Sequence, residues 1–473
     1  MGAATFVILS FEGPDQYSHA GGLGSRIRGL SSALAQMGNE THLFFIGDPD
    51  LPGYETKEVG RLHLHRWCQW ISRYHPGGVY DGESGKEADW SDSIAPWLET
   101  ELLAGKVAAG EIVVVLAEEW QTVRSVIALG RVIERNGWTH RVRIFWNLNN
   151  PFGAERIDWP ALRKVAIITT VSRYMKQFMW RFGVDARVVP NGISHTWFDR
   201  PEGGAVADIR RLLNDRLTLV KVARGDPDKR WNMTIDAVAV MKQQGLSPVL
   251  LARGGVEPHG DEVIARARRR GLSVAPVSWS SDSPKALVLA ISPVAGADVI
   301  DLRGYLNQRQ LKVLYQAADA VIANSGVEPF GLVGLEVMAC GGLAFVGATG
   351  EDYVTPGYDA VSLQTDSPDE LAFHAAHMKL VNVASRAIRR SARRTALRYA
   401  WPSVVRRVLN PMIEELGGRL PLMAGDKDMH DGSPDWDLVL PASSGPGTGR
   451  RSRPPKLVAP SLRRETEVVL VGD

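Results

Sequence analysis

The sequence has little of several features that would narrow its function at once. Only two of its 473 residues are cysteine, Cys68 and Cys340, which excludes a disulfide framework and leads us to expect a reducing, cytoplasmic location. The 55 Lys and Arg almost balance the 53 Asp and Glu, for a net charge of +2, so bulk charge does not indicate a nucleic-acid partner. No apolar run reaches the roughly 18 residues of a membrane span, and residues 1–10 lack the basic start of a secretory signal.

The sequence does contain an alternation of short apolar runs with amphipathic stretches. Apolar runs at 5–10, 42–46, 111–117, 143–148 and 165–171 predict buried strands, and 22–37 predicts a helix. We expect the Trp-rich stretch that follows residue 46, up to about residue 92, to be irregular. The pattern restarts with apolar runs at 216–223, 248–252, 298–302, 320–324 and 343–347, between which 231–243, 308–317 and 333–339 predict helices. Such alternation is typical of parallel α/β sheets.

Pro and Gly gather between residues 190 and 204, where we expect the chain to pass between domains. We therefore predict an α/β fold of two Rossmann-like domains, 1–197 and 198–417, with a cleft between them. The last helices of the second domain are free to pack back on the first. Residues 418–473 are rich in Gly, Pro and Ser and predict a disordered or extended tail. Ligands of such sheets bind at the carboxyl ends of strands, so the loops after strands are the places to look for chemistry.

The most informative such loop contains the segment VEPFGLVGLEVMA. Its turn Phe330-Gly331-Leu332 opens a helix, so unpaired backbone N–H groups and the positive end of the helix dipole are available to an anion. Glu336 lies on the first turns of that helix, where a carboxylate can accept hydrogen bonds from two ribose hydroxyls. Glu328 precedes the turn and can contact a sugar hydroxyl or a developing positive charge.

A second glycine-rich turn, Gly21-Gly22-Leu23-Gly24, lies between the first predicted strand and the first predicted helix. Its glycines allow the backbone to approach a phosphate or a sugar closely. The turn does not complete the G-x-G-x-x-G pattern, because Ile27 stands where the third glycine is needed. A nicotinamide dinucleotide is therefore not favoured.

These segments as a set resemble the retaining GT-B glycosyltransferases, of the glycosyltransferase family 4 and glycogen-synthase-like type. Glu328 and Glu336 match the E-x7-E motif of the donor site in those families. The segments AGGLGSRIRGL, AEEWQT, TTVSRYMKQF, VVPNGIS and VARGDPDKRW also occur in the expected order. The resemblance extends over most of the chain and stops before the predicted tail.

The resemblance implies a GT-B fold and a retaining hexosyltransferase. Such an enzyme moves a hexose, glucose or mannose, from a UDP-, ADP- or GDP-linked donor to a hydroxyl of a carbohydrate or small-molecule acceptor. It also implies that Arg224 and Lys229 grip the donor diphosphate and that the loop of Gly21 and Gly22 closes over the donor phosphates. Two cations at the leaving diphosphate stabilise the charge that builds there, so we expect no metal ion and no cofactor.

One position departs from the pattern of the resembling families. Many of them carry a catalytic His in a T-x-H-N run at a strand end, and here the segment FWNLNNPFG has Asn149 instead. Asn cannot exchange a proton, but it can hydrogen-bond a sugar hydroxyl, so Asn149 and Glu328 are our candidate catalytic residues. The departure leaves one alternative open, a catalytically impaired nucleotide-sugar-binding protein of the same fold. A second alternative, a nucleotide-sugar epimerase, rests on the shared architecture.

Three further features were weighed against a role in the site. The strings Asp48-Pro49-Asp50 and Asp226-Pro227-Asp228 resemble metal-binding D-x-D motifs, but their prolines predict turns. The basic runs 266–270 and 386–398 are interpreted as solvated helix faces or interdomain contacts, with peripheral membrane contact as the alternative. Ten of the 14 Trp precede residue 198; we expect most of them in the core and one or two in an acceptor groove.

Overall fold

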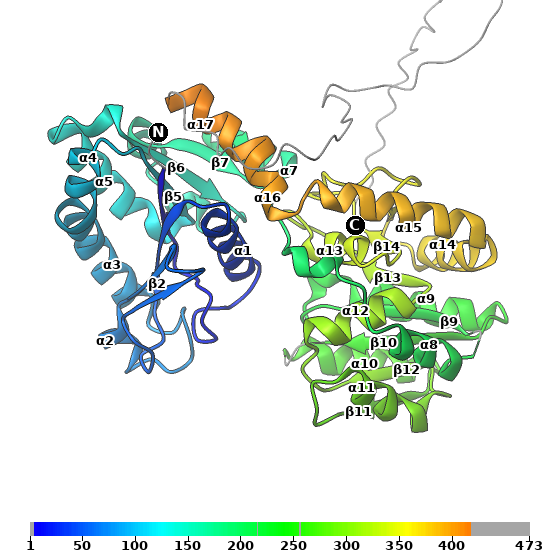
Figure 1. Ribbon diagram of the computed structural model, residues 1–473. Helices are drawn as coiled ribbons and strands as arrows, with labels where there is room; N and C mark the ends of the chain where they lie inside the picture. Colours follow the sequence, from blue (N-terminus) through cyan, green and yellow to red (C-terminus); the bar gives the residue numbers. More distant parts are fainter. Residues whose placement is uncertain (1–3, 215, 255–256, 418–473) are drawn as a thin grey trace, which may run out of the picture. The chain divides into compact units, whose positions relative to one another are not determined.

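A computed structural model describes residues 4–214, 216–254 and 257–417. Contacts divide the chain into two units, 1–423 and 424–473, and the predicted tail lies outside the described residues. The described part contains two sheets, each covered by helices (Figure 1). The predicted α/β fold with two parallel-sheet domains is confirmed. None of the helices that the structure describes is long and apolar enough to cross a membrane.

The first sheet has the strand order β3-β4-β2-β1-β5-β6-β7-β8, and only the pairing of β3 with β4 is antiparallel. Its strands are β1 (Thr5–Leu9), β2 (Glu40–Ile46), β3 (Tyr54–Lys57), β4 (Leu62–Trp67), β5 (Val113–Glu118), β6 (Val142–Leu148), β7 (Ile167–Thr170) and β8 (Arg187–Val188). Every residue of the central strands β1 and β5 is buried, as expected for parallel strands covered on both faces.

The helices of this half are α1 (Gly22–Gln36), α2 (Gln69–Ser72), α3 (Glu83–Trp97), α4 (Ala104–Ala108), α5 (Val123–Arg135), α6 (Trp159–Val165) and α7 (Arg173–Met179). A π-helical segment, Leu98–Leu103, joins α3 to α4. Short 3₁₀ turns lie at Trp120–Thr122, Trp138–His140, Ala154–Arg156, Trp180–Phe182 and His195–Phe198.

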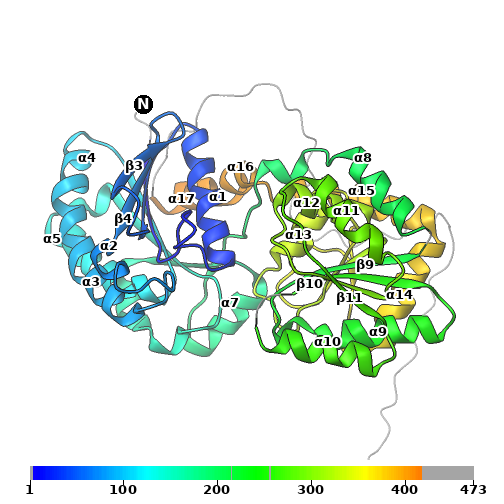
Figure 2. The ribbon, with the colours of Figure 1, turned by 90° about the horizontal axis from the view of Figure 1, so that it is seen from below.

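The second sheet is entirely parallel, in the order β11-β12-β10-β9-β13-β14-β15. Its strands are β9 (Leu217–Val222), β10 (Pro248–Arg253), β11 (Val274–Val277), β12 (Val299–Leu302), β13 (Ala320–Ala323), β14 (Ala344–Val346) and β15 (Val361–Ser362). Its helices are α8 (Gly203–Leu212), α9 (Trp231–Gln243), α10 (His259–Arg269), α11 (Pro284–Ile291), α12 (Gln308–Ala317), α13 (Leu332–Ala339), α14 (Pro368–Leu380) and α15 (Asn382–Leu397), with 3₁₀ turns at Pro227–Lys229 and Ser292–Val294. Figure 2 shows α11 and α12 on one side of this sheet and α9 and α10 on the other.

After α15 the chain returns to the first sheet. Ile193, on the way out, forms a β-bridge with Ala400, on the way back. The returning segment consists of α16 (Trp401–Val404), a π-helical stretch (Val405–Leu409) and α17 (Asn410–Gly417). Its apolar side chains share one buried cluster with Ile27 and Leu30 of α1. The last helices therefore cover one face of the first sheet.

The stretch expected to be irregular is the main error of the sequence analysis. It contains β3, β4, α2 and the first part of α3. β3 (YETK) is a short, mostly exposed edge strand, so it carries no apolar run that would reveal it. β11 was also missed, because Pro276 interrupts its pattern; this strand lies at the sheet edge, where a proline removes no essential hydrogen bond.

Candidate active site

Lys229 and Glu328 meet at the carboxyl ends of two neighbouring strands. Lys229 ends the 3₁₀ turn that follows β9, and Glu328 lies in the loop after β13, the next strand in the sheet. The Lys229 Nζ lies 3.0 Å from a carboxylate oxygen of Glu328 and also donates to the Ser325 hydroxyl at 3.3 Å. Arg224, in the same loop as Lys229, is exposed, and its guanidinium has no hydrogen bond or ion pair among the residues described. Lys229 is thus held by an acid, whereas Arg224 is available to a ligand.

The turn at residues 330–332 is fixed by its side chains and offers its backbone. Phe330 is buried against Tyr353 and Tyr399, and the Tyr353 hydroxyl donates to the Gly331 carbonyl. Gly331 has a φ of +79°, and a Cβ there would come within 2.8 Å of the Glu351 side chain, so only glycine fits. Helix α13 begins at Leu332 without a side-chain cap, and within the described chain no acceptor is found for the N–H groups of these three residues.

Glu336 occupies the second turn of α13, and its carboxyl has no partner among the residues that the structure describes. It is half-buried, and no hydrogen bond or ion pair of its carboxyl is found in the described part of the chain. Burial raises the pKa of Glu336 to about 8, because the charged form loses hydration without gaining a partner. A hydroxyl-bearing ligand could supply the hydrogen bonds that this carboxyl lacks.

Glu351, which the sequence analysis missed, lies beneath the same turn. It follows β14, is only 7% exposed, and accepts a hydrogen bond from the Thr349 N–H at 3.0 Å through one oxygen. The other oxygen is buried and has no hydrogen-bond partner among the described residues. Burial, together with the nearby Glu328 charge, raises the pKa of Glu351 to about 7. An acid in the loop after the predicted strand 343–347 was the signal available for this residue.

Glu12 holds the glycine-rich turn of the first half. One oxygen of its buried carboxylate accepts hydrogen bonds from the N–H groups of Ala20, Gly21 and Gly24, at 3.1, 3.0 and 2.9 Å. The other oxygen accepts from the Tyr80 hydroxyl at 2.7 Å. The sequence analysis expected this turn to close over donor phosphates and did not anticipate Glu12, which already uses the Gly21 N–H.

Gly22 remains free to take part in donor binding. It is exposed, and no hydrogen bond of its N–H is found in the described ranges. A Cβ at Gly22 would lie 3.9 Å from a methyl group of Leu332. The predicted phosphate turn of the first half therefore lies beside the predicted phosphate turn of the second.

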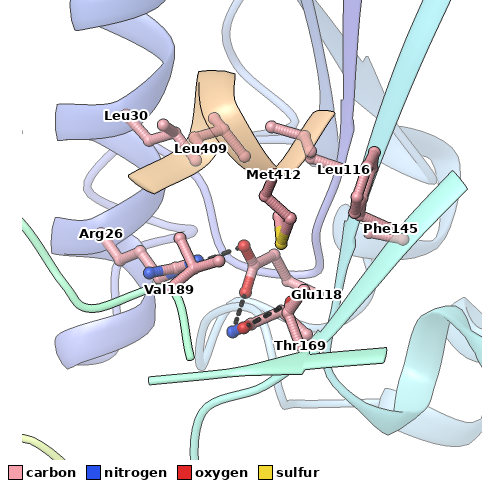
Figure 3. Close-up of a pocket in the computed structure, with 11 residues that line it drawn as sticks. Arg26, Leu30, Leu116, Glu118, Phe145, Thr169, Val189, Leu409 and Met412 are labelled. Atoms are coloured by element: carbon pink, nitrogen blue, oxygen red, sulfur yellow. Dashed lines mark hydrogen bonds and ion pairs between the residues drawn. The ribbon is translucent and has the colours of Figure 1, made fainter. Parts of the chain in front are cut away.

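Asn149 lies in a buried polar network at the ends of β5 and β6. Its side-chain amide donates to Glu118 at 2.8 Å, and its backbone N–H donates to Glu119 at 2.7 Å. Its side-chain oxygen is buried and lacks a partner within the described ranges. Glu118 also binds Arg26 at 3.0 Å and Asn147 at 2.9 Å, beside a small cavity of about 20 Å³ (Figure 3). The Asn149 side chain is thus tied to an acid on one side and offers an acceptor on the other.

Glu119 is both strained and buried. Its backbone has φ +68° and ψ 163°, a conformation that almost only glycine adopts, and such outliers concentrate at functional sites. Neighbours hold it there, because its carbonyl accepts from the Trp146 indole and the Thr122 hydroxyl. Burial raises the pKa of Glu119 to about 8. In the sequence analysis this residue stands only within the segment AEEWQT.

The remaining features have structural roles. Each D-x-D string forms a turn, in which the Asp48 side chain accepts from the Asp50 N–H and the Asp226 side chain from the Asp228 N–H. Among the ten tryptophans before residue 198, Trp90 and Trp146 are fully buried and Trp70 is 62% exposed. In the basic runs, Arg266 and Arg270 bind Asp236, and Arg389 and Arg393 bind backbone carbonyls of other elements.

Part of the chain matches a known protein family. Residues 208–394 match the family model of glycosyl transferases group 1, and this range contains every site residue of the second half. D-inositol 3-phosphate glycosyltransferase of Geodermatophilus obscurus is 29% identical over 263 residues, which are 54% of this chain and 52% of that protein. The chain thus spans about half the length of this curated relative.

Similar solved structures extend over both halves. Sucrose-phosphate synthase from Thermosynechococcus elongatus has 18% identity and a TM-score of 0.58, covering 87% of this chain and 99% of that one. Anabaena HepE in complex with UDP-glucose has 13% identity and a TM-score of 0.56, covering 86% and 99%. The chain therefore has the GT-B fold of these structures, and its residues 208–394 match the family model of glycosyl transferases group 1.

Proposed function

We propose that this protein is a retaining glycosyltransferase that moves a hexose from a nucleoside diphosphate sugar to an acceptor hydroxyl. The observation that carries the proposal is the set of groups after β9 and β13. A guanidinium, a lysine–glutamate pair, a run of backbone N–H groups and a carboxyl gather there, and apart from the lysine–glutamate pair none of these groups has a partner among the described residues. The guanidinium matches a diphosphate, and the lysine–glutamate pair matches a sugar. The N–H groups match further phosphate or sugar oxygens, and the carboxyl matches a ribose.

Each donor-side residue then has a distinct task. Arg224 and Lys229 bind the diphosphate, and the N–H groups of residues 330–332 bind phosphate or sugar oxygens, as backbone amides at a helix start do. Glu336 accepts hydrogen bonds from the ribose hydroxyls. Glu328 contacts the sugar. When the donor binds, Lys229 exchanges its ion pair with Glu328 for an ion pair with the diphosphate.

The chemical step needs no proton donor from Asn149. The bond from the sugar C1 to the diphosphate oxygen breaks, and the acceptor oxygen bonds to C1 from the same face. The acceptor proton passes to the leaving phosphate oxygen, so the atoms balance without a side-chain base. Arg224 and Lys229 stabilise the negative charge on the leaving group, and Glu328 stabilises the positive charge on the sugar.

The donor and acceptor are part of the same proposal. Glucose is the favoured hexose and mannose the next, with UDP, ADP or GDP as the nucleotide; Anabaena HepE, for comparison, is known in complex with UDP-glucose. We propose a carbohydrate or small-molecule acceptor, transfer without a metal ion or cofactor, and action in the cytoplasm, with which two buried, unpaired cysteines are compatible.

Donor binding and turnover test the proposal in sequence. Purified protein is screened with UDP-, ADP- and GDP-sugars by thermal shift, since a ligand that binds only the folded state raises the melting temperature. Donors that bind are then assayed for hydrolysis and, with mixed acceptors, for transfer. We expect one nucleotide to stabilise the protein and its sugar to be released or transferred with the anomeric configuration retained. Binding of none, with no turnover of any, contradicts the proposal.

A second candidate is a protein that binds a nucleotide sugar without transferring it. Asn149 favours it, since a His stands there in many members of the resembling families. Calorimetric binding without hydrolysis or transfer would support this candidate, and hydrolysis that appears in Asn149→His would strengthen it. Conversion of the donor without any acceptor would instead indicate an epimerase.

A further inference from the structure

A compact group of imidazoles lies on one face of the first sheet, away from the candidate active site. The parallel strands β2 and β4 pair with His42 opposite His63, and Glu40 is two residues before His42, so all three side chains project from the same face. One potential ligand atom from each of Glu40, His42 and His63 lies within 4.8 Å of the other two. These residues are near the amino ends of their strands, whereas Glu12, Glu118 and Glu119 follow the carboxyl ends of β1 and β5.

Each imidazole has a partner on the nitrogen that faces away from the group. His42 Nδ1 lies 3.1 Å from His65 Nε2, and His63 Nδ1 lies 2.7 Å from the Tyr54 hydroxyl. A histidine that binds a metal ion through one nitrogen almost always donates its other N–H to such a partner, which fixes the ring orientation.

The carboxylate of Glu40 is oriented in the same way. One of its oxygens lies 3.0 Å from His42 Nε2, and the other lies 2.6 Å from Lys106 Nζ. Lys106 also contacts Glu111, at 3.3 Å, so its positive charge is shared between two acids. One Glu40 oxygen is therefore held by Lys106 while the other faces the imidazoles.

We propose that Glu40, His42 and His63 bind one Zn²⁺ or a similar divalent transition-metal ion. Two imidazoles and one carboxylate are a ligand set that Zn²⁺ uses in proteins, with a water in the fourth position. Glu40 and His63 are half-buried, which leaves a side of the group open to solvent.

The position of the site assigns it a structural task. The ion would join β2 to β4, and Glu40 would connect it to Lys106 on α4. None of the donor-side residues of the second sheet binds this ion. The ion therefore has no part in the sugar transfer proposed above, which uses no metal. Its presence should change the stability of the first sheet and leave sugar transfer unchanged.

Metal titration of the full, tag-free chain tests the site. The chelated and dialysed protein is titrated with Zn²⁺ by calorimetry and with Co²⁺ by visible absorption, which reports four-coordinate Co²⁺. We expect one ion per chain, a visible band, and a rise in melting temperature on addition of Zn²⁺. His63→Gln and Glu40→Gln should each weaken binding by at least about 10-fold. His63 and Glu40 are both partly exposed, so circular dichroism should show that both variants stay folded.

A matched control separates this site from adventitious histidines. His374→Ala combined with His377→Ala removes an i, i+3 pair on α14 and should leave stoichiometry and affinity unchanged. The proposal is overturned if the wild type gives no Co²⁺ band and no Zn²⁺ binding, or if His63→Gln binds as the wild type does. Donor binding measured on the same samples with and without chelator is a separate readout, so failure of the metal site does not affect the proposed function.

Discussion

The Lys229 ammonium and the Glu328 carboxylate lie 3.0 Å apart and join the loops after β9 and β13. The pair holds both loops in place before a donor arrives. It also places a negative charge where the resemblance predicts a sugar and a positive charge where it predicts a diphosphate. When a donor binds, Lys229 should therefore replace its contact with Glu328 by a contact with the donor phosphate.

Substitution Lys229→Ala should reduce kcat/KM for the donor by about 100- to 1000-fold, the loss typical of one electrostatic group in a transition state. It removes the cation at the leaving group and leaves Glu328 without its partner. Steady-state kinetics with the best donor measures this reduction in kcat/KM. The control is Lys242→Ala, which breaks an ion pair with Asp298 at the far end of α9 and should leave kcat/KM unchanged. Equal kinetics of wild type and Lys229→Ala would remove Lys229 from the site.

Glu336 should make donor binding depend on pH. Its pKa is about 8, and the ionised carboxylate is the better acceptor for two hydroxyls. Affinity for the nucleotide should therefore rise between pH 7 and 9 in the wild type. Glu336→Gln should bind more weakly at pH 9 and lose this part of the rise. Calorimetry at several pH values gives both curves, and parallel curves would contradict the assignment.

The same substitution should change stability with a defined sign. The folded pKa of Glu336, about 8, is above its ordinary value of 4.5, so the folded state holds a proton that the unfolded state releases between these values. The free energy of unfolding contributed by this group therefore falls as pH rises from 4.5 to 8. Denaturant titrations at pH 5 and pH 8 should show a smaller decrease in Glu336→Gln than in the wild type.

Glu12→Ala should lower both stability and donor affinity. It leaves three N–H groups and the Tyr80 hydroxyl without their acceptor, and one unsatisfied buried polar group costs about 1–3 kcal/mol. Gly24→Ala should act similarly, because its Cβ would lie 3.0 Å from the Glu12 carboxylate. Denaturant melts and donor calorimetry measure the two effects. Glu99→Ala, which breaks an exposed pair with Arg135, is the control and should change neither.

Trp401→Ala should destabilise the first sheet by about 3–5 kcal/mol, as for other buried large-to-small substitutions. Trp401 covers Gly29, where a Cβ would come within 2.1 Å of its indole nitrogen, so Gly29→Ala should be destabilising through the same contact. Chemical denaturation measures both. Trp70→Ala removes an exposed indole and should have little effect. Wild-type stability of Trp401→Ala would show that the returning helices do not support the first sheet.

The sequence predicted those parts whose signal is local. The apolar runs of β1 and β5 reveal buried strands, and α9 and α12 have the bounds expected from their periodicity. The polar strand β3 and the helix α3 were missed, because neither has the matching apolar pattern. The segment 327–339 could be singled out as a candidate donor loop because its residues are close together in the sequence.

The parts of the site that were missed depend on contacts between distant residues or on backbone conformation. Glu12 matters because the chain folds back so that three N–H groups of the next loop reach it. Glu351 matters because β14 ends beside β13, which brings it under Gly331. The conformation of Glu119 is imposed by Trp146 and Thr122, so no property of residue 119 alone could have indicated it.

The packing of α16 and α17 on the first sheet has a consequence for synthesis of the protein on the ribosome. The eight strands of that sheet are complete at Val188, yet one of its faces is covered by side chains up to Ile413. After the first half leaves the ribosome, this apolar face therefore stays exposed while more than 200 further residues are translated. We expect a chaperone to bind this surface during synthesis. We also expect a protein truncated after the first half to aggregate.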